Sequence, residues 1–318
     1  MKVHIRGRYD RLGELVPRRF PVVIAGENQP PISEGSGRLE LARWIASPTH
    51  PLTARVIVNR VWQGHFGRGI VGTPSNFGFL GERPTNPALL DWLASEFTAR
   101  AQGETGNVKN QPSDKFACDW SIKRLHRLIM LSNAYQRSSE LSRSARVKDA
   151  DNRLFGRMNR RRLEAEEIRD SLLSASGTLD SQMGGVAFRE MNLPRRTVYL
   201  MTIRSDRTGF GTLFDTADSN SSSEKRGVST VAPQALFLLN NPFVLSQAQK
   251  LSKRLIAENA VDFQRIQSAY LILYGRPATP AELQIGQAFL KGEERSPASK
   301  WEAYCQILLC ANEFLYVD

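Results

Sequence analysis

Residues 160–177 read RRRLEAEEIRDSLLSASG, and this stretch decides the class of fold that the sequence predicts. Apolar residues recur in it at helical spacing: Ala165, Ile168, Leu172 and Ala175. They predict a helix from Leu163 to Ser176, which Gly177 ends because glycine favours the conformation that terminates helices. Leu163 and Leu173 add apolar surface beside the opposite, acidic face. We therefore expect this helix to be buried on two sides, within a mainly helical domain.

The same periodicity continues along most of the chain. It predicts further helices over residues 39–45, 52–66, 121–135, 234–239, 243–258, 262–274, 280–291 and 299–314. Asn86-Pro87 indicates the start of another helix, and the run from Thr279 to Glu282 has the pattern of a capping box. Strands are expected only at Val3–Ile5 and Thr197–Arg204. The predicted fold class is mainly α: an irregular multi-helix domain with one or two minor β-strands.

Breaker residues suggest how the chain is divided. Residues 1–36 contain several prolines and glycines and read as an extended linker or arm. Residues 37–318 read as a single α-rich domain. Two stretches inside it lack any apolar pattern, and we expect mobile loops near residues 103–118 and 216–228.

The balance of charge narrows the possible partners. The 318 residues carry 43 Lys and Arg against 32 Asp and Glu, a net charge of +11 that reads as spread along the chain. Such a charge attracts polyanions, including acidic polysaccharide. Specific nucleic-acid binding is disfavoured, because no zinc-finger, RNP or GxxG motif accompanies the charge. No apolar run reaches the ~20 residues of a membrane-spanning helix.

Glu166 and Asp170 are the first candidates for catalysis. They lie four residues apart on the predicted helix, so their carboxylates are neighbours. Two such groups near apolar surface need a proton, a cation or arginine partners. They are therefore either an acid/base pair or members of an ion-pair cluster in which Arg162 and Arg169 neutralise them.

A second candidate site follows the helix that ends at Phe66. Trp62 and His65 lie one turn apart there, and a histidine among aromatic residues can be a ligand, a general base or a packed core residue. His65 is thus a further catalytic candidate. The candidate binding residues are Arg60, Trp62, Arg162 and Arg226.

No metal site and no cofactor are expected in this chain. Cys305 and Cys310 are five apart and point about 140° away from each other on a helix, so they cannot share a metal. Cys305 fits the apolar stripe of that helix and is interpreted as a core residue. The acidic run from Asp215 to Asn220 resembles half of a calcium loop but lacks the glycine and the closing glutamate.

Long stretches of the sequence resemble one known family. The runs LARWIASPTHPLTARVIVNRVWQGHFGRGIV (residues 41–71) and NFGFLGERPTNPALLDWLASEF (residues 76–97) resemble planctomycete-specific domain one, a domain of unknown function. The resemblance extends over roughly residues 36–318 and ends on NEFLYVD. It implies a C-terminal module of a larger protein of the cell envelope or periplasm. It also implies a cytochrome-c-like domain as partner, and it supplies no catalytic residues.

Two hypotheses of function follow. The first is a non-catalytic scaffold or binding module of a larger cell-envelope protein, which binds acidic polysaccharide or a partner domain. The alternative is a hydrolytic enzyme on a glycan or sulfated polymer, with Glu166 and Asp170 as its reactive pair.

Overall fold

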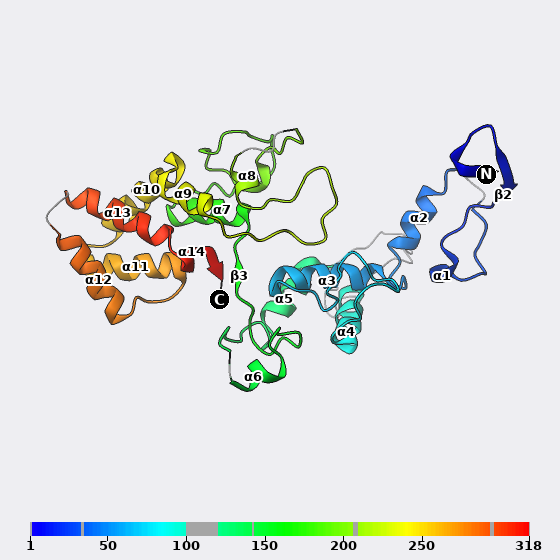
Figure 1. Cartoon of the computed structure of the whole chain (residues 1–318), viewed down its shortest axis with the longest axis horizontal. Helices are drawn as coiled ribbons and strands as arrows, with labels where there is room; N and C mark the ends of the chain where they lie inside the picture. Colours follow the sequence, from blue (N-terminus) through cyan, green and yellow to red (C-terminus); the bar gives the residue numbers. More distant parts are fainter. Residues whose placement is uncertain are drawn as a thin grey trace, which may run out of the picture. The chain divides into compact units, whose positions relative to one another are not determined.

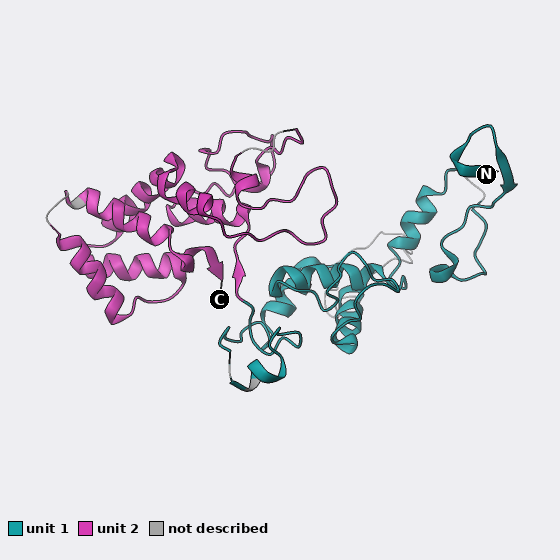
Figure 2. Cartoon of the chain, viewed as in Figure 1, with its two compact units in different colours: residues 1–159 teal, residues 160–318 magenta. Residues whose placement is uncertain are grey.

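The structure of the chain is a computed structural model that describes residues 2–32, 35–99, 120–141, 143–205, 209–292 and 296–317. It divides into two compact units, residues 1–159 and 160–318, each with its own hydrophobic core (Figure 2). The division falls inside the range that the sequence analysis treats as one domain. The predicted fold class is confirmed, since the described residues are mainly helical with two small two-stranded sheets. The loop expected near residues 103–118 lies outside the described residues.

The first unit is organised around three helices (Figure 1). Its elements are β1 (Lys2–His4), a 3-10 turn (Ile5–Gly7), β2 (Leu12–Leu15), α1 (Val22–Ala25), α2 (Arg38–Ile45), α3 (Thr53–Phe66), α4 (Pro87–Thr98), α5 (Ile122–Met130) and α6 (Arg143–Lys148). Val58, Trp62 and Phe66 recur every four residues on α3, so they bury one face of it against α4 and α5. The Asn86 side chain accepts a hydrogen bond from the Leu89 amide at 3.1 Å, which confirms the predicted start of α4.

The turn after α3 is fixed by one buried side chain. Asn59 donates from Nδ2 to the Val71 carbonyl at 3.0 Å and accepts from the Val71 amide at 2.8 Å. A Cβ on Gly69 would lie 2.5 Å from the Val71 oxygen and 2.6 Å from the Asn59 Nδ2. Only glycine fits at this close approach, and the turn positions the end of α3.

The second unit is built on the helix predicted from its first residues. Its elements are β3 (Arg161–Arg162), α7 (Ala165–Ala175), a 3-10 turn (Thr197–Tyr199), α8 (Phe210–Leu213), α9 (Ala232–Asn240), α10 (Pro242–Glu258), α11 (Asp262–Tyr274), α12 (Pro280–Lys291), α13 (Pro297–Leu309), α14 (Asn312–Leu315) and β4 (Tyr316–Val317). Helix α10 packs on α7 and along α13, whose Cys305 and Leu309 are fully buried. Cys305 is therefore a core residue, as predicted, and burial raises the pKa of its thiol to about 12.

A short antiparallel sheet joins the beginning and end of the second unit. Arg161 pairs with Val317 and Arg162 with Tyr316, and the Leu163 amide donates to the Leu315 carbonyl at 2.8 Å. The chain therefore returns to the start of α7 after the helices α8 to α14 (Figure 1).

Two parts of the fold differ from the predictions. The expected strand at Thr197–Arg204 is wrong: Thr197–Tyr199 forms a 3-10 turn, and Leu200 makes only an isolated bridge with Phe188. The Thr197 amide and hydroxyl both donate hydrogen bonds to Asp170 of α7. These hydrogen bonds compete with strand pairing. The arm, for its part, contains a β1–β2 hairpin and the single-turn helix α1 where no helix was expected.

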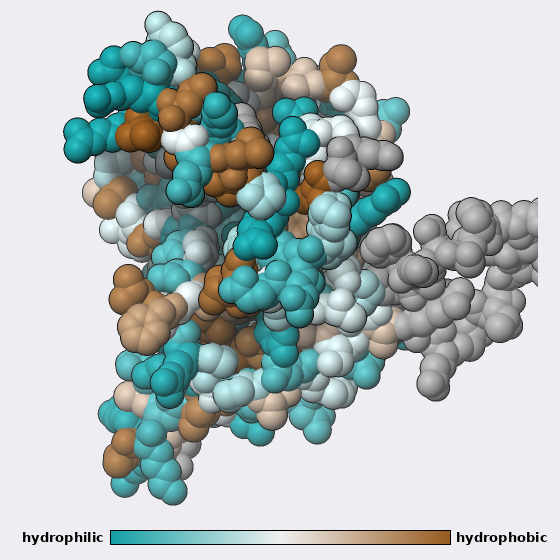
Figure 3. Space-filling model, turned by 90° about the vertical axis from the view of Figure 1, so that its right-hand side faces the viewer, coloured by the Kyte–Doolittle hydropathy of each residue, from teal (hydrophilic) through white to brown (hydrophobic). Residues whose placement is uncertain are grey.

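The surface carries both hydrophobic and hydrophilic residues. On the face drawn in Figure 3, hydrophobic side chains are interspersed with hydrophilic ones. Among the described residues, no helix has both the length and the apolar character needed to cross a membrane.

Arg169 of α7 is a fully buried cation, with 0% of its side chain exposed. Its guanidinium donates to the carbonyls of Met191 (2.9 Å), Leu193 (2.5 Å) and Arg195 (2.9 Å) and to the Thr197 hydroxyl (3.0 Å). Burial lowers the pKa of the guanidinium, while the neighbouring Asp170 raises it. Because each carbonyl would lose its donor without this side chain, Arg169 holds residues 191–197 against α7.

We predict that Arg169→Lys destabilises the protein by about 2–4 kcal/mol, since one ammonium cannot reach three carbonyls that the planar guanidinium bridges. Urea unfolding followed by circular dichroism measures the change. The control is Arg189→Lys, because Arg189 is exposed and its guanidinium contacts the Met201 sulfur at 3.3 Å, with no carbonyl acceptor among the described residues. A loss of less than about 0.5 kcal/mol for Arg169→Lys contradicts the structural role of the guanidinium.

Candidate functional site

Glu166 lies at the N-terminal turn of α7 and is ion-paired to a residue far along the chain. Arg226 donates from Nη1 to Glu166 at 2.6 Å and lies 3.0 Å from a Glu164 oxygen. The hydrogen bond to Glu166 is the main cause of a raised pKa at Arg226. Arg226, predicted as a binding residue, thus fastens the serine-rich loop expected near residues 216–228 onto α7.

Asp170, one turn further along α7, is engaged by different groups. It accepts hydrogen bonds from the Thr197 amide at 2.7 Å and the Thr197 hydroxyl at 2.5 Å. Arg196 approaches the Asp170 carboxylate at 3.4 Å. Only 18% of the Asp170 side chain is exposed. The two carboxylates are therefore held by separate partners, which suits an ion-pair and hydrogen-bond cluster that fixes two loops on one helix.

Arg162 is buried at the start of the second unit. It donates from Nη1 to the Ser229 carbonyl, and its guanidinium lies 5.8 Å from the centre of the Phe214 ring. Ser229 also donates to Asp215 from its amide at 2.8 Å and from its hydroxyl at 2.8–2.9 Å. Asp215 thus caps a turn, and Arg162 anchors the end of the same loop as Arg226.

His65 lies in the first unit, at the end of α3, and contacts a histidine that the sequence analysis did not select. Its Nε2 is 2.7 Å from Nδ1 of His126 on α5, and the two rings meet edge to face. The Tyr135 ring lies 5.3 Å from the His65 ring at 90°. His126 stands 61 residues away in the sequence, and its place beside an apolar stripe is the one signal that could have suggested it.

The other two candidates on α3 have different environments. Trp62 is 4% exposed, stacks on Phe66 at 4.2 Å and meets Phe155 edge to face. It is therefore a core residue in the structure, not a surface available to a ligand. Arg60 is exposed, and within the described part of the chain no carboxylate lies at ion-pair distance from it.

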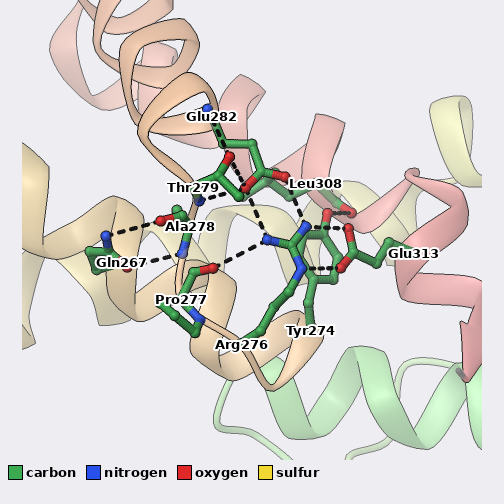
Figure 4. A network of polar contacts seen from close by, with 9 residues as sticks. All are labelled: Gln267, Tyr274, Arg276, Pro277, Ala278, Thr279, Glu282, Leu308 and Glu313. Atoms are coloured by element: carbon green, nitrogen blue, oxygen red, sulfur yellow. Dashed lines mark hydrogen bonds and ion pairs between the residues drawn. The ribbon is translucent and has the colours of Figure 1, made fainter. Parts of the chain in front are cut away.

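Sequence reasoning missed a polar cluster centred on Arg276, between α11 and α12 (Figure 4). Its guanidinium pairs with Glu282 at 2.8 Å and with Glu313 at 2.6 Å, and lies 5.9 Å from the Tyr274 ring centre. The Tyr274 hydroxyl donates to the Leu308 carbonyl at 2.9 Å, and burial raises the pKa of this phenol. The arrangement ties α11, α12, α13 and α14 together.

Glu282 also closes the predicted capping box at the start of α12. It accepts from the Thr279 amide at 2.7 Å, while the Thr279 hydroxyl accepts from the Glu282 amide at 3.3 Å. The hydrogen bond from Arg276 lowers the pKa of Glu282 from its ordinary 4.5 to about 2. The capping box is thereby confirmed and linked to the cluster.

An open groove of about 1200 Å³ runs beside the Arg276 cluster, within the second unit. Tyr274, Arg276, Arg254 and Glu313 contribute to its lining, together with serine, threonine and asparagine side chains. Arg160 is a third arginine of the lining, while Arg254 pairs with Glu258 at 2.9 Å and Arg276 pairs with Glu313 at 2.6 Å. The groove therefore offers polar and apolar groups together.

The residues that could serve a metal are few. No group of three or more His, Cys, Asp or Glu side chains is gathered for a metal ion anywhere in the described ranges.

Comparison with known proteins places the chain in a family. The model of the PSD1 family, described as a protein of unknown function (DUF1553), matches residues 37–290. The chain belongs to the PSD1 family. No curated protein and no solved structure matches it.

The positive charge of this PSD1 protein, which the sequence analysis describes as spread along the chain, is divided unequally between the two units. Residues 1–159 carry 24 Lys and Arg against 14 Asp and Glu, a net charge of +10. Residues 160–318 carry 19 against 18, a net charge of +1. The surplus that can attract an anionic partner therefore belongs to the first unit.

Three exposed cations of the first unit lie on helices that contact each other. They are Arg60 of α3 and Lys123 and Arg127 of α5, and we call them the α3–α5 cations. Among the described residues, none of the three has a carboxylate at ion-pair distance. Arg124 of α5 differs from these three cations, because it pairs with Glu96 of α4 at 2.7 Å.

We predict that Glu282 gives the protein an acid-sensitive stability. A carboxylate whose pKa is about 2 in the folded state and 4.5 otherwise stabilises the fold above pH 4.5, and this contribution is lost as the pH falls toward 2. Between pH 6 and pH 3, the free energy of unfolding is expected to fall less in Glu282→Gln than in the unmodified protein. The expected difference is about 1 kcal/mol after solvent screening.

Urea unfolding at the two pH values measures this difference. Glu258→Gln is the matched control, because it removes the same charge from an exposed pair with Arg254. Equal pH dependence in the unmodified protein and in Glu282→Gln contradicts the assigned pairing.

Proposed function

We propose that this PSD1 protein is a non-catalytic binding module that holds an acidic polysaccharide through the cations of its first unit. The observation that carries the proposal is the unequal charge, +10 in residues 1–159 against +1 in residues 160–318. Polyanions bind where fixed cations displace their counterions, and unpaired surface cations do this at the lowest cost. The α3–α5 cations are exposed and have no carboxylate at ion-pair distance within the described ranges.

The second unit supplies rigidity in this proposal. Arg169, Arg226 and Arg276 are each committed to partners inside it, and their hydrogen bonds join helices and loops. A cation already paired with a carboxylate has little left to offer a ligand, because the carboxylate must be displaced and resolvated first.

The hydrolytic alternative receives less support. An acid/base pair must exchange protons with a substrate, yet Glu166 is paired with Arg226 at 2.6 Å and Asp170 accepts two hydrogen bonds from Thr197. These contacts use both carboxylates to hold loops on α7, Glu166 through Arg226 and Asp170 through Thr197. We therefore assign them to the scaffold.

The resemblance to planctomycete-specific domain one extends the proposal to a setting. The module is proposed to act within a larger protein of the cell envelope or periplasm, where acidic polysaccharides are at hand. A cytochrome-c-like domain is the proposed partner, and the binding module would place it on the polymer.

The test compares two triple variants of the full chain on heparin, a sulfated polysaccharide. Arg60, Lys123 and Arg127 are changed to Gln in the first, and Lys250, Lys253 and Lys291, which are exposed on α10 and α12, in the control. Both lose three charges. The first is expected to bind at least tenfold more weakly at 0.15 M salt, with the slope of log K against log salt reduced by ~2–3.

The control is expected to bind within twofold of the unmodified protein. Equal weakening of both variants means that the charge acts diffusely and overturns the assignment to α3 and α5. Elution of the unmodified protein below physiological salt overturns polysaccharide binding itself. Equally tight binding of double-stranded DNA contradicts selectivity for polysaccharide.

A further inference from the structure

Two imidazoles face each other on adjoining helices of the first unit. Nε2 of His65 and Nδ1 of His126 are 2.7 Å apart, and the ring centres are 4.9 Å apart at an angle of 72°. A hydrogen bond between two imidazoles needs a proton on one nitrogen and a lone pair on the other. The pair therefore shares one proton between two groups that are both metal ligands when neutral.

We propose that His65 and His126 form a binding site for a divalent transition-metal ion that prefers imidazole, with Cu(II) the strongest. In the binding step the donor ring releases the shared proton to solvent and takes up one proton at its other ring nitrogen, so both rings stay neutral, and each facing nitrogen donates its lone pair to the metal. Two metal–nitrogen bonds of about 2.0 Å at a right angle place the nitrogens ~2.8 Å apart, close to the 2.7 Å between them in the structure. The helices need not move to admit the ion.

The surroundings of the pair allow this exchange. His126 is exposed, so its ring can turn until its lone pair and that of His65 converge on one point. His65 is half-buried and its orientation is limited by the edge-to-face contact with Tyr135. One rigid and one adjustable ligand leave the remaining coordination positions to water, as the tetragonal geometry of Cu(II) permits.

Copper is the expected preference for two reasons. Affinities of nitrogen sites for divalent ions rise through the first-row series to Cu(II) and fall again at Zn(II). Zn(II) in addition favours tetrahedral angles, which would separate the two nitrogens to ~3.3 Å. The positive charge of Lys123 and Arg127 on the same helix opposes a dication, so we expect binding that is specific but moderate in strength.

The experiment titrates the full chain with copper chloride and follows calorimetry and the electron paramagnetic resonance spectrum. All variants carry His4→Gln, because the exposed His4 near the amino end is a competing imidazole. This background is expected to bind one ion with two nitrogen donors. Adding His126→Gln or His65→Gln is expected to weaken binding at least tenfold, and circular dichroism checks that each variant is folded.

Adding His50→Gln is the matched control, since it removes a histidine whose Nδ1 already accepts from the Leu52 and Thr53 amides. Copper binding is expected to survive this change. The proposal is overturned if the His4→Gln background binds no copper, or if binding persists when His126 is replaced. Because His126 is exposed, its replacement tests the site without disturbing the core.

Discussion

A guanidinium removed from water must keep its donors satisfied, and in the second unit three backbone carbonyls and one hydroxyl meet this requirement. Arg169 has no exposed side-chain surface, and its donors reach Met191, Leu193 and Arg195. The irregular chain after α7 is consequently bent around one side chain. Phe188 and Phe243 lie against the same guanidinium at 5.3 and 5.6 Å, which joins this bend to the helical core.

The acidic residues of α7 take their roles from the same constraint. Asp170 binds Thr197, whose hydroxyl also accepts from Arg169, so the two neighbours on the helix hold one loop together. Glu166 holds the next loop through Arg226. In the structure, Glu166 and Asp170, which the sequence suggests as a possible reactive pair, attach two loops to α7. The net positive charge that we propose a ligand uses belongs instead to the first unit, at +10 against +1.

Much of the helical framework could be predicted from the sequence, because its signals are local. The four-residue spacing of apolar residues on α3 and the caps at Asn86 and Thr279 each act within a few positions. The partners of the candidate site residues could not be predicted in this way. Arg226 lies 60 positions from Glu166, and His126 lies 61 positions from His65. The sequence therefore suggested a nearer arginine, Arg162, as a partner of the acidic pair. The strand expected at Thr197–Arg204 failed for a related reason, since its side-chain propensity is outweighed by distant hydrogen bonds from α7.

The central claim is that the first unit binds an acidic polymer while the second unit provides a preformed scaffold. Hydrogen exchange of the full chain, measured by mass spectrometry with and without heparin, tests it most directly. We predict slower exchange in peptides that cover α3 and α5, and unchanged exchange in peptides from α7 to α14. Slower exchange confined to α7 and its attached loops, with α3 and α5 unaffected, would contradict this account.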